Sequence, residues 1–321
     1  MCDVASLLKK SPEESEDKLR CQACGIEVDE GVDICPHCEE PVRLITLAEL
    51  GRRLPIGIID TKDGVKHLIK DFTVVKLDWT KEREISKAWK SISRRPNITM
   101  FDYVLCVLAH TVTNIGGIDF SKHNLEHRMH ILGEMFAGDV FYMYAYLRVF
   151  SLGPEFDLRN LRCPSCNSHI SRYGVDLSTI EVSTREDVDK LTQKVVLRNG
   201  FTLANGIRKT IYLQPASIRA LSASTIEDDD AEFFANILKS TCVGIEGVEG
   251  AVITDQEIVQ LEPYDLALIR DASDWIAGGV NWSVDVDCDC GFTFDQIIDW
   301  RYGNFFSLSS RSTMMRRHSK S

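Results

Sequence analysis

The stretch CPSCN at residues 163–167 decides how this chain folds, because it carries one half of a tetrahedral metal site and needs the other half from elsewhere. Cys163 and Cys166 form an ordinary C-x2-C knuckle, in which Pro164 fixes one backbone angle. Asn167 stands where such knuckles usually have glycine, and asparagine tolerates the left-handed backbone conformation better than most residues. The stretch therefore predicts half of a zinc site.

A second pair of cysteines lies far along the chain in CDCG at residues 288–291. Cys288 and Cys290 are one residue closer together than in an ordinary knuckle, so their geometry is tighter, and His169 is the obvious substitute for one of them. We expect the two pairs to share one zinc ion and so to close residues 161–310 into one α+β domain. The alternative is that they are buried free cysteines, as we expect for the two cysteines in apolar runs, Cys106 and Cys242.

An N-terminal module, residues 21–38, carries four more cysteines with the spacing C-x2-C-x10-C-x2-C. Two such knuckles suit tetrahedral zinc, with iron and a redox role as alternatives, and so short a segment cannot fold without a metal. We therefore predict two structural Zn²⁺ ions per chain. The predicted ligands are Cys21, Cys24, Cys35 and Cys38 at the N-terminal site, and Cys163, Cys166, Cys288 and Cys290 at the other.

The composition is that of a globular, acidic protein: of 321 residues, 44% are apolar and 26% charged, and the formal net charge is −11. This charge argues against nucleic acid as a partner, since nucleic-acid binders neutralise phosphates with Lys and Arg. Residues 1–20 lack the apolar segment of a secretory signal, and the most apolar stretches, 98–112 and 135–150, are too short to span a bilayer. We expect a protein of the reducing cytosol, where its 11 cysteines favour metal ligation over disulfides.

The remaining patterns predict an α+β fold with a helical body and small antiparallel sheets. Alternating residues around Asp63-Gly64 predict a β-hairpin, and a charged amphipathic helix follows. Two apolar helices come next, one from a cap at Asn97 and one from near Asp139. Two Asn-Gly pairs between residues 193 and 215 predict the turns of an antiparallel meander. No long repeat is evident.

These patterns divide the chain into six regions. They are a flexible leader at 1–20, a zinc ribbon at 21–40, a β-hairpin plus amphipathic helix at 46–95, an apolar helical region at 96–160, a domain closed by the distant knuckles at 161–310, and a flexible basic tail at 311–321.

Signs of catalysis are weak. The chain has no P-loop, no H-E-x-x-H, no G-x-S-x-G and no dinucleotide-binding glycine pattern. His123, His127 and His130 share one helical face with Glu134, which favours a solvated or partner-facing helix over a metal site. Because both predicted sites have four cysteine ligands, neither leaves a position for water, and we expect no enzyme activity.

Several longer stretches carry a resemblance to a known family. They are FYMYAYLRVFSLG at 141–153, LRCPSCNSHISRYGVDLSTIEV at 161–182, IRKTIYLQPAS at 207–217, CVGIEGVEG at 242–250, LEPYDLALIRDASDWIAGGVNWSVDVDCDCG at 261–291, and FF at 305–306. Their order, from about residue 50 to residue 310, resembles the zinc-containing baseplate hub and tail assembly proteins of contractile-tailed, T-even-like bacteriophages. The family closes its site with a full C-P-x-C-G knuckle, whereas this chain has C-D-C-G, and the N-terminal module is an addition.

The resemblance implies a non-enzymatic protein that builds the phage tail baseplate or is built into it. Its partners would be other hub and tail proteins in a symmetric assembly, and its location would be the virion tail baseplate, with the host cytoplasm during assembly. The alternative from another class is a cytosolic zinc-ribbon regulator that contacts nucleic acid or a polymerase through residues 21–38.

Overall fold

The computed structural model describes residues 19–20, 27–28, 36–37, 45–203, 206–223, 230–248, 253–300 and 305–306. The chain divides into two compact units, Met1–Leu44 and Ile45–Ser321. In the first unit, β1 (Leu19–Arg20) pairs antiparallel with β2 (Glu27–Val28). All four predicted ligands of the N-terminal zinc site lie outside the described residues, so that site stays a prediction, as do the leader and the tail.

The second unit begins with an antiparallel sheet in the order β4-β5-β6-β7 and the helices that pack on it. The predicted hairpin is confirmed, because Asp63 and Gly64 both have positive φ, 54° and 80°, as a two-residue hairpin turn requires. The elements are β3 (Ile45–Thr46), α1 (Leu47–Leu50), β4 (Arg53–Lys62), β5 (Val65–Val74), α2 (Trp79–Ile92), α3 (Met100–Thr111), β6 (Val112–Ile115), β7 (Ile118–Asp119), η2 (Phe120–Lys122), α4 (Leu125–Glu134) and α5 (Ala137–Leu152).

One expected helix start is corrected, and the other, near Asp139, is confirmed. Helix α3 begins after Thr99 rather than at Asn97, whose φ of 59° is not that of an N-cap residue. Helix α5 begins at Ala137, and Asp139 is a fully buried residue of its first turn. The sequence near a helix start does not show whether a carboxylate caps that helix or, like Asp139, accepts hydrogen bonds from the backbone of a distant strand.

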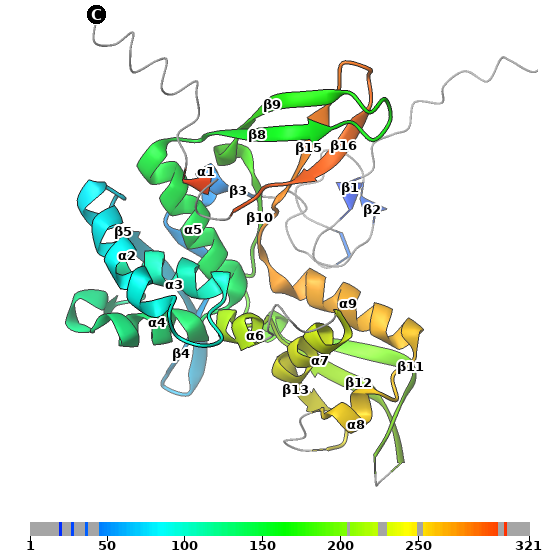
Figure 1. Cartoon of the computed structure of the whole chain (residues 1–321). Coiled ribbons are helices and arrows are strands. Elements are labelled where there is room, and N and C mark those ends of the chain that lie inside the picture. The colour runs from blue at the N-terminus through cyan, green and yellow to red at the C-terminus, as the bar shows by residue number, and fades with distance from the viewer. Residues whose placement is uncertain are drawn as a thin grey trace, which may run out of the picture. The chain divides into compact units, whose positions relative to one another are not determined.

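The second unit also contains two β-hairpins that are distant from each other in the sequence. One is formed by β8 and β9 and the other by β15 and β16 (Figure 1). A short antiparallel sheet in the order β14-β10-β3 joins the start of the second unit to two strands that lie between these hairpins in the sequence, β10 and β14. The bounds are β8 (Glu155–Arg162), β9 (His169–Asp176), η3 (Leu177–Thr179), β10 (Glu181–Ser183), η4 (Asp189–Leu191), β14 (Gly279–Val280), β15 (Ser283–Asp287) and β16 (Thr293–Ile297).

The chain between η4 and β14 folds around a hydrophobic core of its own, which includes Phe201, Ile211, Leu238 and Ile269. Its sheet has the order β11-β12-β13, and α7 and α9 pack on it (Figure 1). The bounds are β11 (Gln193–Leu203), β12 (Gly206–Leu213), α6 (Ile218–Ala223), α7 (Asp230–Thr241), β13 (Cys242–Ile245), α8 (Asp255–Ile258) and α9 (Pro263–Ala277). β11 pairs with β12 as far as Leu203↔Gly206, and Asn205 of the second predicted Asn-Gly turn lies outside the described residues. The first pair, Asn199-Gly200, lies at a bulge within β11 rather than in a turn.

The larger core is built by α1 to α5, their sheet and the two hairpins. Tyr142 and Tyr144 of α5 are fully buried in it, so these aromatic side chains stabilise the fold and are not exposed for binding a partner. The Tyr144 ring stacks on that of Phe305, with ring centroids 5.5 Å apart. In the described part of the chain, no helix combines the length and apolar character needed to cross a membrane.

The structure contains an internal repeat, which corrects the expectation that there is none. Residues 53–153 (repeat 1) and 193–278 (repeat 2) share an order of six elements, with β4, β5, α3, β6, α4 and α5 recurring as β11, β12, α7, β13, α8 and α9. Repeat 1 also contains α2, β7 and η2, and repeat 2 contains α6. Pairing agrees residue by residue: Phe72↔Ile115, Thr73↔Asn114 and Val74↔Val112 recur as Ile211↔Ile245, Tyr212↔Gly244 and Leu213↔Cys242. Few side chains are shared between the repeats, so only backbone geometry reveals the relation.

Candidate metal centre

Each cysteine pair near the middle and end of the chain sits in the turn of a β-hairpin. In the turn between β8 and β9, the Cys163 N–H donates to the Ser168 carbonyl (3.1 Å), and the Asn167 N–H donates to the Cys163 carbonyl (2.9 Å). Asn167 has φ of 57°, so the expected left-handed conformation is confirmed. Asparagine therefore does here what glycine does in other knuckles.

The shortened pair is positioned in the same way between β15 and β16. The Cys288 N–H donates to the Phe292 carbonyl (3.0 Å), and the Gly291 N–H donates to the Cys288 carbonyl (2.8 Å). Gly291 has φ of 82°, a conformation that other residues rarely adopt. A glycine directly after Cys290 thus lets the chain reverse although one residue of an ordinary knuckle is missing.

The structure brings the two pairs together. The sulfur atoms of Cys163, Cys166, Cys288 and Cys290 all lie within 4.8 Å of one another. The Cys163–Cys290 and Cys166–Cys288 Sγ–Sγ distances are both 3.7 Å. A tetrahedron of sulfurs about 2.3 Å from a central zinc has edges of about 3.8 Å. A disulfide needs an S–S distance of about 2.05 Å, so these sulfurs are spaced for a metal and not for a covalent bond.

The four ligand candidates differ in exposure. Cys163 and Cys288 are buried, whereas Cys166 and Cys290 are exposed. Each hairpin therefore supplies one sulfur from the protein interior and one from the surface.

Ser168 is a part of the site that the sequence analysis missed. Its Oγ lies 3.0 Å from Cys166 Sγ and 3.2 Å from Cys288 Sγ, one sulfur from each hairpin. A hydrogen bond with the Ser168 side chain lowers the pKa of the Cys166 thiol to about 6. Hydroxyl groups next to thiolates orient metal ligands, but a serine after a knuckle is too common in sequences to be a signal.

His169 does not replace a cysteine in the cluster. It lies in β9, exposed and paired with Arg162 of β8, and the sulfurs of both Cys288 and Cys290 are within the group of four. The structure therefore favours the four cysteines over a ligand set that includes His169. The hairpin turn, rather than the spacing of the two cysteines, decides where their sulfurs point.

His127 and His130 are exposed residues of α4, but His123 precedes the helix and its N-cap Asn124, so the prediction of one helical face for all three histidines is wrong. The His123 and His127 ring centroids are 4.6 Å apart, and those of His127 and His130 are 6.2 Å apart. His130 Nδ1 lies 2.7 Å from an Arg219 guanidinium nitrogen, and Arg219 also forms an ion pair with Glu134 (2.7 Å). Among the described residues, the cysteine cluster is the group of three or more His, Cys, Asp or Glu side chains close enough to share a metal ion.

The two hairpins also contact each other through side chains away from the cysteines. Phe156 and Leu158 of β8, and Val286 of β15, are buried in the larger core. The Tyr173 hydroxyl of β9 accepts from the Asp287 N–H at 3.5 Å. A metal at the cysteines would therefore join two layers that already pack together.

The outward face of β8–β9 is basic. Arg159 and Arg172 are directly opposite each other across the strand pair, and like charges in that position repel. Arg172 is neutralised by Asp157 (2.8 Å), whereas Arg159 and the neighbouring Arg162 have no ion-pair partner within the part of the chain described above. This face carries unneutralised positive charge on an acidic protein.

Comparison of this chain with protein-family models, with curated proteins and with solved structures yields no significant match.

Proposed function

We propose that the four-cysteine cluster binds one structural Zn²⁺, and that the protein is a structural or assembly component of a contractile phage tail baseplate. The observation that carries the metal assignment is the pair of 3.7 Å distances between sulfurs of different hairpins. Cys163, Cys166, Cys288 and Cys290 would hold the ion, and zinc supplies four strong bonds to thiolates without redox chemistry.

Four sulfur ligands support a structural role for the metal. Catalytic zinc keeps an open position for water or substrate, and a set of four thiolates fills every position of a tetrahedral ion. The ion would also close a loop that contains all of repeat 2. Closing so long a loop removes many conformations from the unfolded chain and so stabilises the folded one.

The baseplate assignment rests on the ordered resemblance to zinc-containing hub and tail assembly proteins. It would have the protein act through protein–protein contacts, with other hub and tail proteins as partners in a symmetric assembly. Co-sedimentation of the purified chain with assembling tails, followed by cryo-EM of the complex, tests it. Binding to a defined baseplate position supports the proposal, and failure to associate at any stage of assembly contradicts it.

The metal assignment has a separate test. Native mass spectrometry of the full chain should report two zinc ions, one from the N-terminal module and one from the cluster. The Cys163→Ser variant should lose one ion, and a Cys21→Ser variant should lose the other. A wild-type chain with iron, or with no metal that depends on Cys163, would contradict the assignment.

A second candidate function, contact with nucleic acid, is favoured by the unneutralised Arg159 and Arg162 beside the knuckle. Phosphate contacts by such side chains make binding strongly salt-dependent. Binding of a DNA or RNA duplex that weakens steeply between low and physiological salt, and that is lost in an Arg159→Glu, Arg162→Glu variant, would favour this function over the baseplate.

A further inference from the structure

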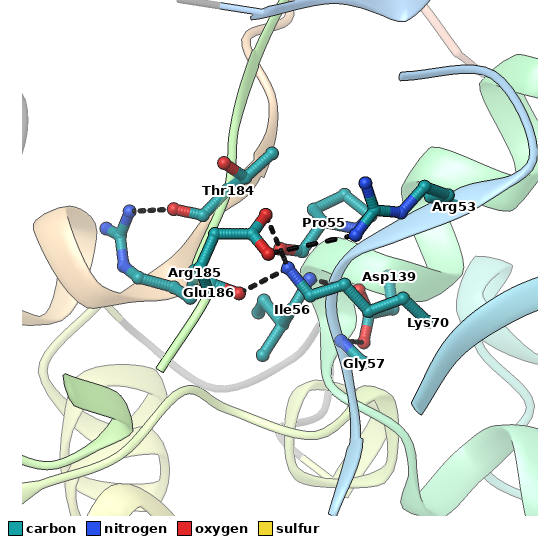
Figure 2. A network of polar contacts seen from close by, with 9 residues as sticks. All are labelled: Arg53, Pro55, Ile56, Gly57, Lys70, Asp139, Thr184, Arg185 and Glu186. Atoms are coloured by element: carbon teal, nitrogen blue, oxygen red, sulfur yellow. Dashed lines mark hydrogen bonds and ion pairs between the residues drawn. The ribbon is translucent and has the colours of Figure 1, made fainter. Parts of the chain in front are cut away.

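A buried aspartate holds a bulge in the first strand of repeat 1. Asp139 Oδ1 and Oδ2 accept from the backbone N–H groups of Ile56 (2.8 Å) and Gly57 (2.9 Å), as Figure 2 shows. Gly57 has φ of 100°, and its backbone lies against Lys70 of β5, where a Cβ atom would meet Lys70 Cγ at 3.0 Å. Lys70 Nζ in turn reaches the Pro55 carbonyl at 3.5 Å.

Repeat 2 has the same arrangement at the corresponding positions. Asp265 accepts from the N–H groups of Arg198 (2.6 Å), Asn199 (3.1 Å) and Gly200 (2.9 Å). Gly200 has φ of 71° and lies against Lys209, whose Nζ donates to the Arg198 carbonyl at 2.9 Å. The counterpart of Arg198 in repeat 1 is a proline without an N–H, which explains why Asp139 accepts two backbone bonds and Asp265 three.

The repeats differ in what covers the edge of this strand. In repeat 1 the segment Thr184–Glu186 lies along β4: the Arg185 N–H donates to the Pro55 carbonyl (2.8 Å), and Lys70 Nζ donates to the Arg185 carbonyl (2.5 Å) (Figure 2). The Glu186 carboxylate forms an ion pair with Lys70 (2.8 Å). As a result, the side chain of Lys70 is only 6% exposed.

In repeat 2 no described segment takes the place of Thr184–Glu186 beside Arg198, although further along β11 the Asn199 side chain donates to the Glu262 carboxylate (2.7 Å) and the Thr202 N–H donates to the Gln260 side chain (2.8 Å). β11 is the terminal strand of its sheet, Lys209 is exposed, and no carboxylate contacts it within the described residues. The second residue of α5, Gly138, is buried against the backbone of β14, but its counterpart in α9, Tyr264, is 53% exposed. The Arg198 guanidinium lies over the Tyr264 ring, 5.5 Å from its centroid.

We propose that the edge of β11, at Arg198, Lys209 and Tyr264, docks an extended acidic segment of a partner protein in the way that Thr184–Glu186 docks on β4. The backbone of the partner segment adds to the strand edge, a common mode of peptide recognition. Its carboxylate pairs with Lys209 as Glu186 pairs with Lys70. Exposed tyrosine and arginine side chains are the residue types that contribute most to binding energy at interfaces.

The partner is an acidic protein segment rather than a nucleic acid for two reasons. The N–H groups of the bulge are taken by Asp265, so this edge offers the Arg198 carbonyl, which can accept from a peptide N–H as the Pro55 carbonyl accepts from Arg185 and which finds no such donor in a sugar-phosphate chain. In repeat 1 the residue that makes the backbone contact, Arg185, is followed directly by the residue whose carboxylate pairs with the lysine, Glu186. Lys209 therefore favours a partner segment with a carboxylate at that same position. This docking surface does not depend on the proposed zinc site or on the baseplate assignment.

The experiment uses the full chain and a fluorescein-labelled peptide, EVSTREDVD, which copies residues 181–189. Fluorescence anisotropy should show saturable binding to the wild-type protein. Lys209→Gln should weaken binding about tenfold, since a hydrogen bond between charged groups has that effect when one partner is lost. A second peptide has glutamine in place of the residue that copies Glu186. Its affinity for the wild-type protein should be as low as that of the first peptide for the Lys209→Gln variant, and Lys209→Gln should not lower it further.

Matched controls separate docking at β11 from other effects. Lys66→Gln removes an exposed lysine of β5 and should leave peptide affinity unchanged, and both variants should keep the wild-type melting temperature. Absence of binding at peptide concentrations up to about 1 mM overturns the proposal. So does binding that Lys209→Gln does not weaken, because the peptide would then be exchanging with its own copy at β4.

Discussion

Asp139 and Asp265 occupy the same place in two copies of one arrangement: each is the third residue of a helix and accepts backbone N–H groups from a bulge in the first strand of a hairpin. Both side chains are fully buried. A buried carboxylate is tolerated when its oxygens accept several hydrogen bonds. The two aspartates therefore explain why helix and hairpin keep the same relation in both repeats although their sequences differ.

Replacing the bulge glycines should destabilise both repeats. Gly57→Ala brings a Cβ to 2.8 Å from the Ile69 carbonyl, and Gly200→Ala brings one against the Arg208 carbonyl, both in backbone with positive φ. We expect each to reduce the free energy of unfolding by more than about 2 kcal/mol, as measured by chemical denaturation. Gly244→Ala is the control, because its Cβ would meet only a Tyr212 ring atom at 3.6 Å. Equal stability of all three variants would refute the bulge geometry.

Asp139 should make stability depend on pH. Burial raises the pKa of Asp139 to about 7, while the N–H groups of Ile56 and Gly57 and the charge of Lys70 lower it. In the unfolded chain an aspartate has a pKa of about 3.9, so between about pH 4 and pH 7 the folded protein binds more protons at this group. The contribution of Asp139 to stability is therefore full below about pH 4 and is lost as the pH rises through about 7.

The measurement is urea unfolding of wild type and Asp139→Asn at several pH values from about 5 to about 8. The wild type should lose stability relative to the variant across this range, by an amount on the order of a few kcal/mol. Subtracting the two curves removes the effect of the cysteine ligands, which also respond to acid. A difference that is constant with pH would show that Asp139 stays charged in the fold.

Loss of one cysteine from either knuckle should destabilise the whole second unit. Cys163→Ser and Cys290→Ser each remove a sulfur from the cluster, so the proposed zinc ion no longer holds β8–β9 to β15–β16. Chemical denaturation should show a loss of several kcal/mol, and the variants should aggregate more readily. Ser165→Ala, in the same turn but without a ligand atom, should behave as wild type. Wild-type unfolding of the cysteine variants would mean that no metal links the hairpins.

Ser168→Ala should weaken metal binding without unfolding the hairpins. Its hydroxyl contacts one sulfur of each knuckle, and loss of such a neighbour typically reduces metal affinity by about 10- to 100-fold. Competition with a chromophoric chelator measures this, with Ser171→Ala on β9 as the control. If Ser168→Ala holds its metal as tightly as wild type, the hydroxyl plays no part in the site.

Local patterns were sufficient wherever neighbouring residues decide the structure. The hairpin at Asp63-Gly64, the left-handed Asn167 and the proline at the start of α9 follow from backbone preferences that operate over a few residues. The meeting of the two cysteine pairs was also predictable, since thiolates in knuckles have few other roles in a reducing environment. The N-terminal module has equally clear spacing, but it lies outside the residues that the structure describes.

What local patterns could not show were relations between distant backbones. Asn199-Gly200 resembles a hairpin turn in sequence, but it forms a bulge because Asp265 accepts three of the backbone N–H groups there. Ser168 belongs to the site only because the fold brings Cys288 of the second knuckle within hydrogen-bond distance of its hydroxyl. The internal repeat is hard to recognise in the sequence because different residues fill the two cores, and the shared aspartate, glycine and lysine of the bulge lie far apart along each repeat.

The sequence by itself therefore determined the cysteine half-sites, the hairpin and helix signals and the acidic character of this protein, because each depends on residue chemistry or short-range geometry. Only the tertiary structure decided that Ser168 contacts both cysteine pairs, that two repeats share one Asp–Gly–Lys bulge, and that a segment covers this bulge in repeat 1 but, among the described residues, not in repeat 2. The physical reason is that these features depend on tertiary contacts between strand edges and buried carboxylates. The spacing of residues along the sequence does not specify such contacts.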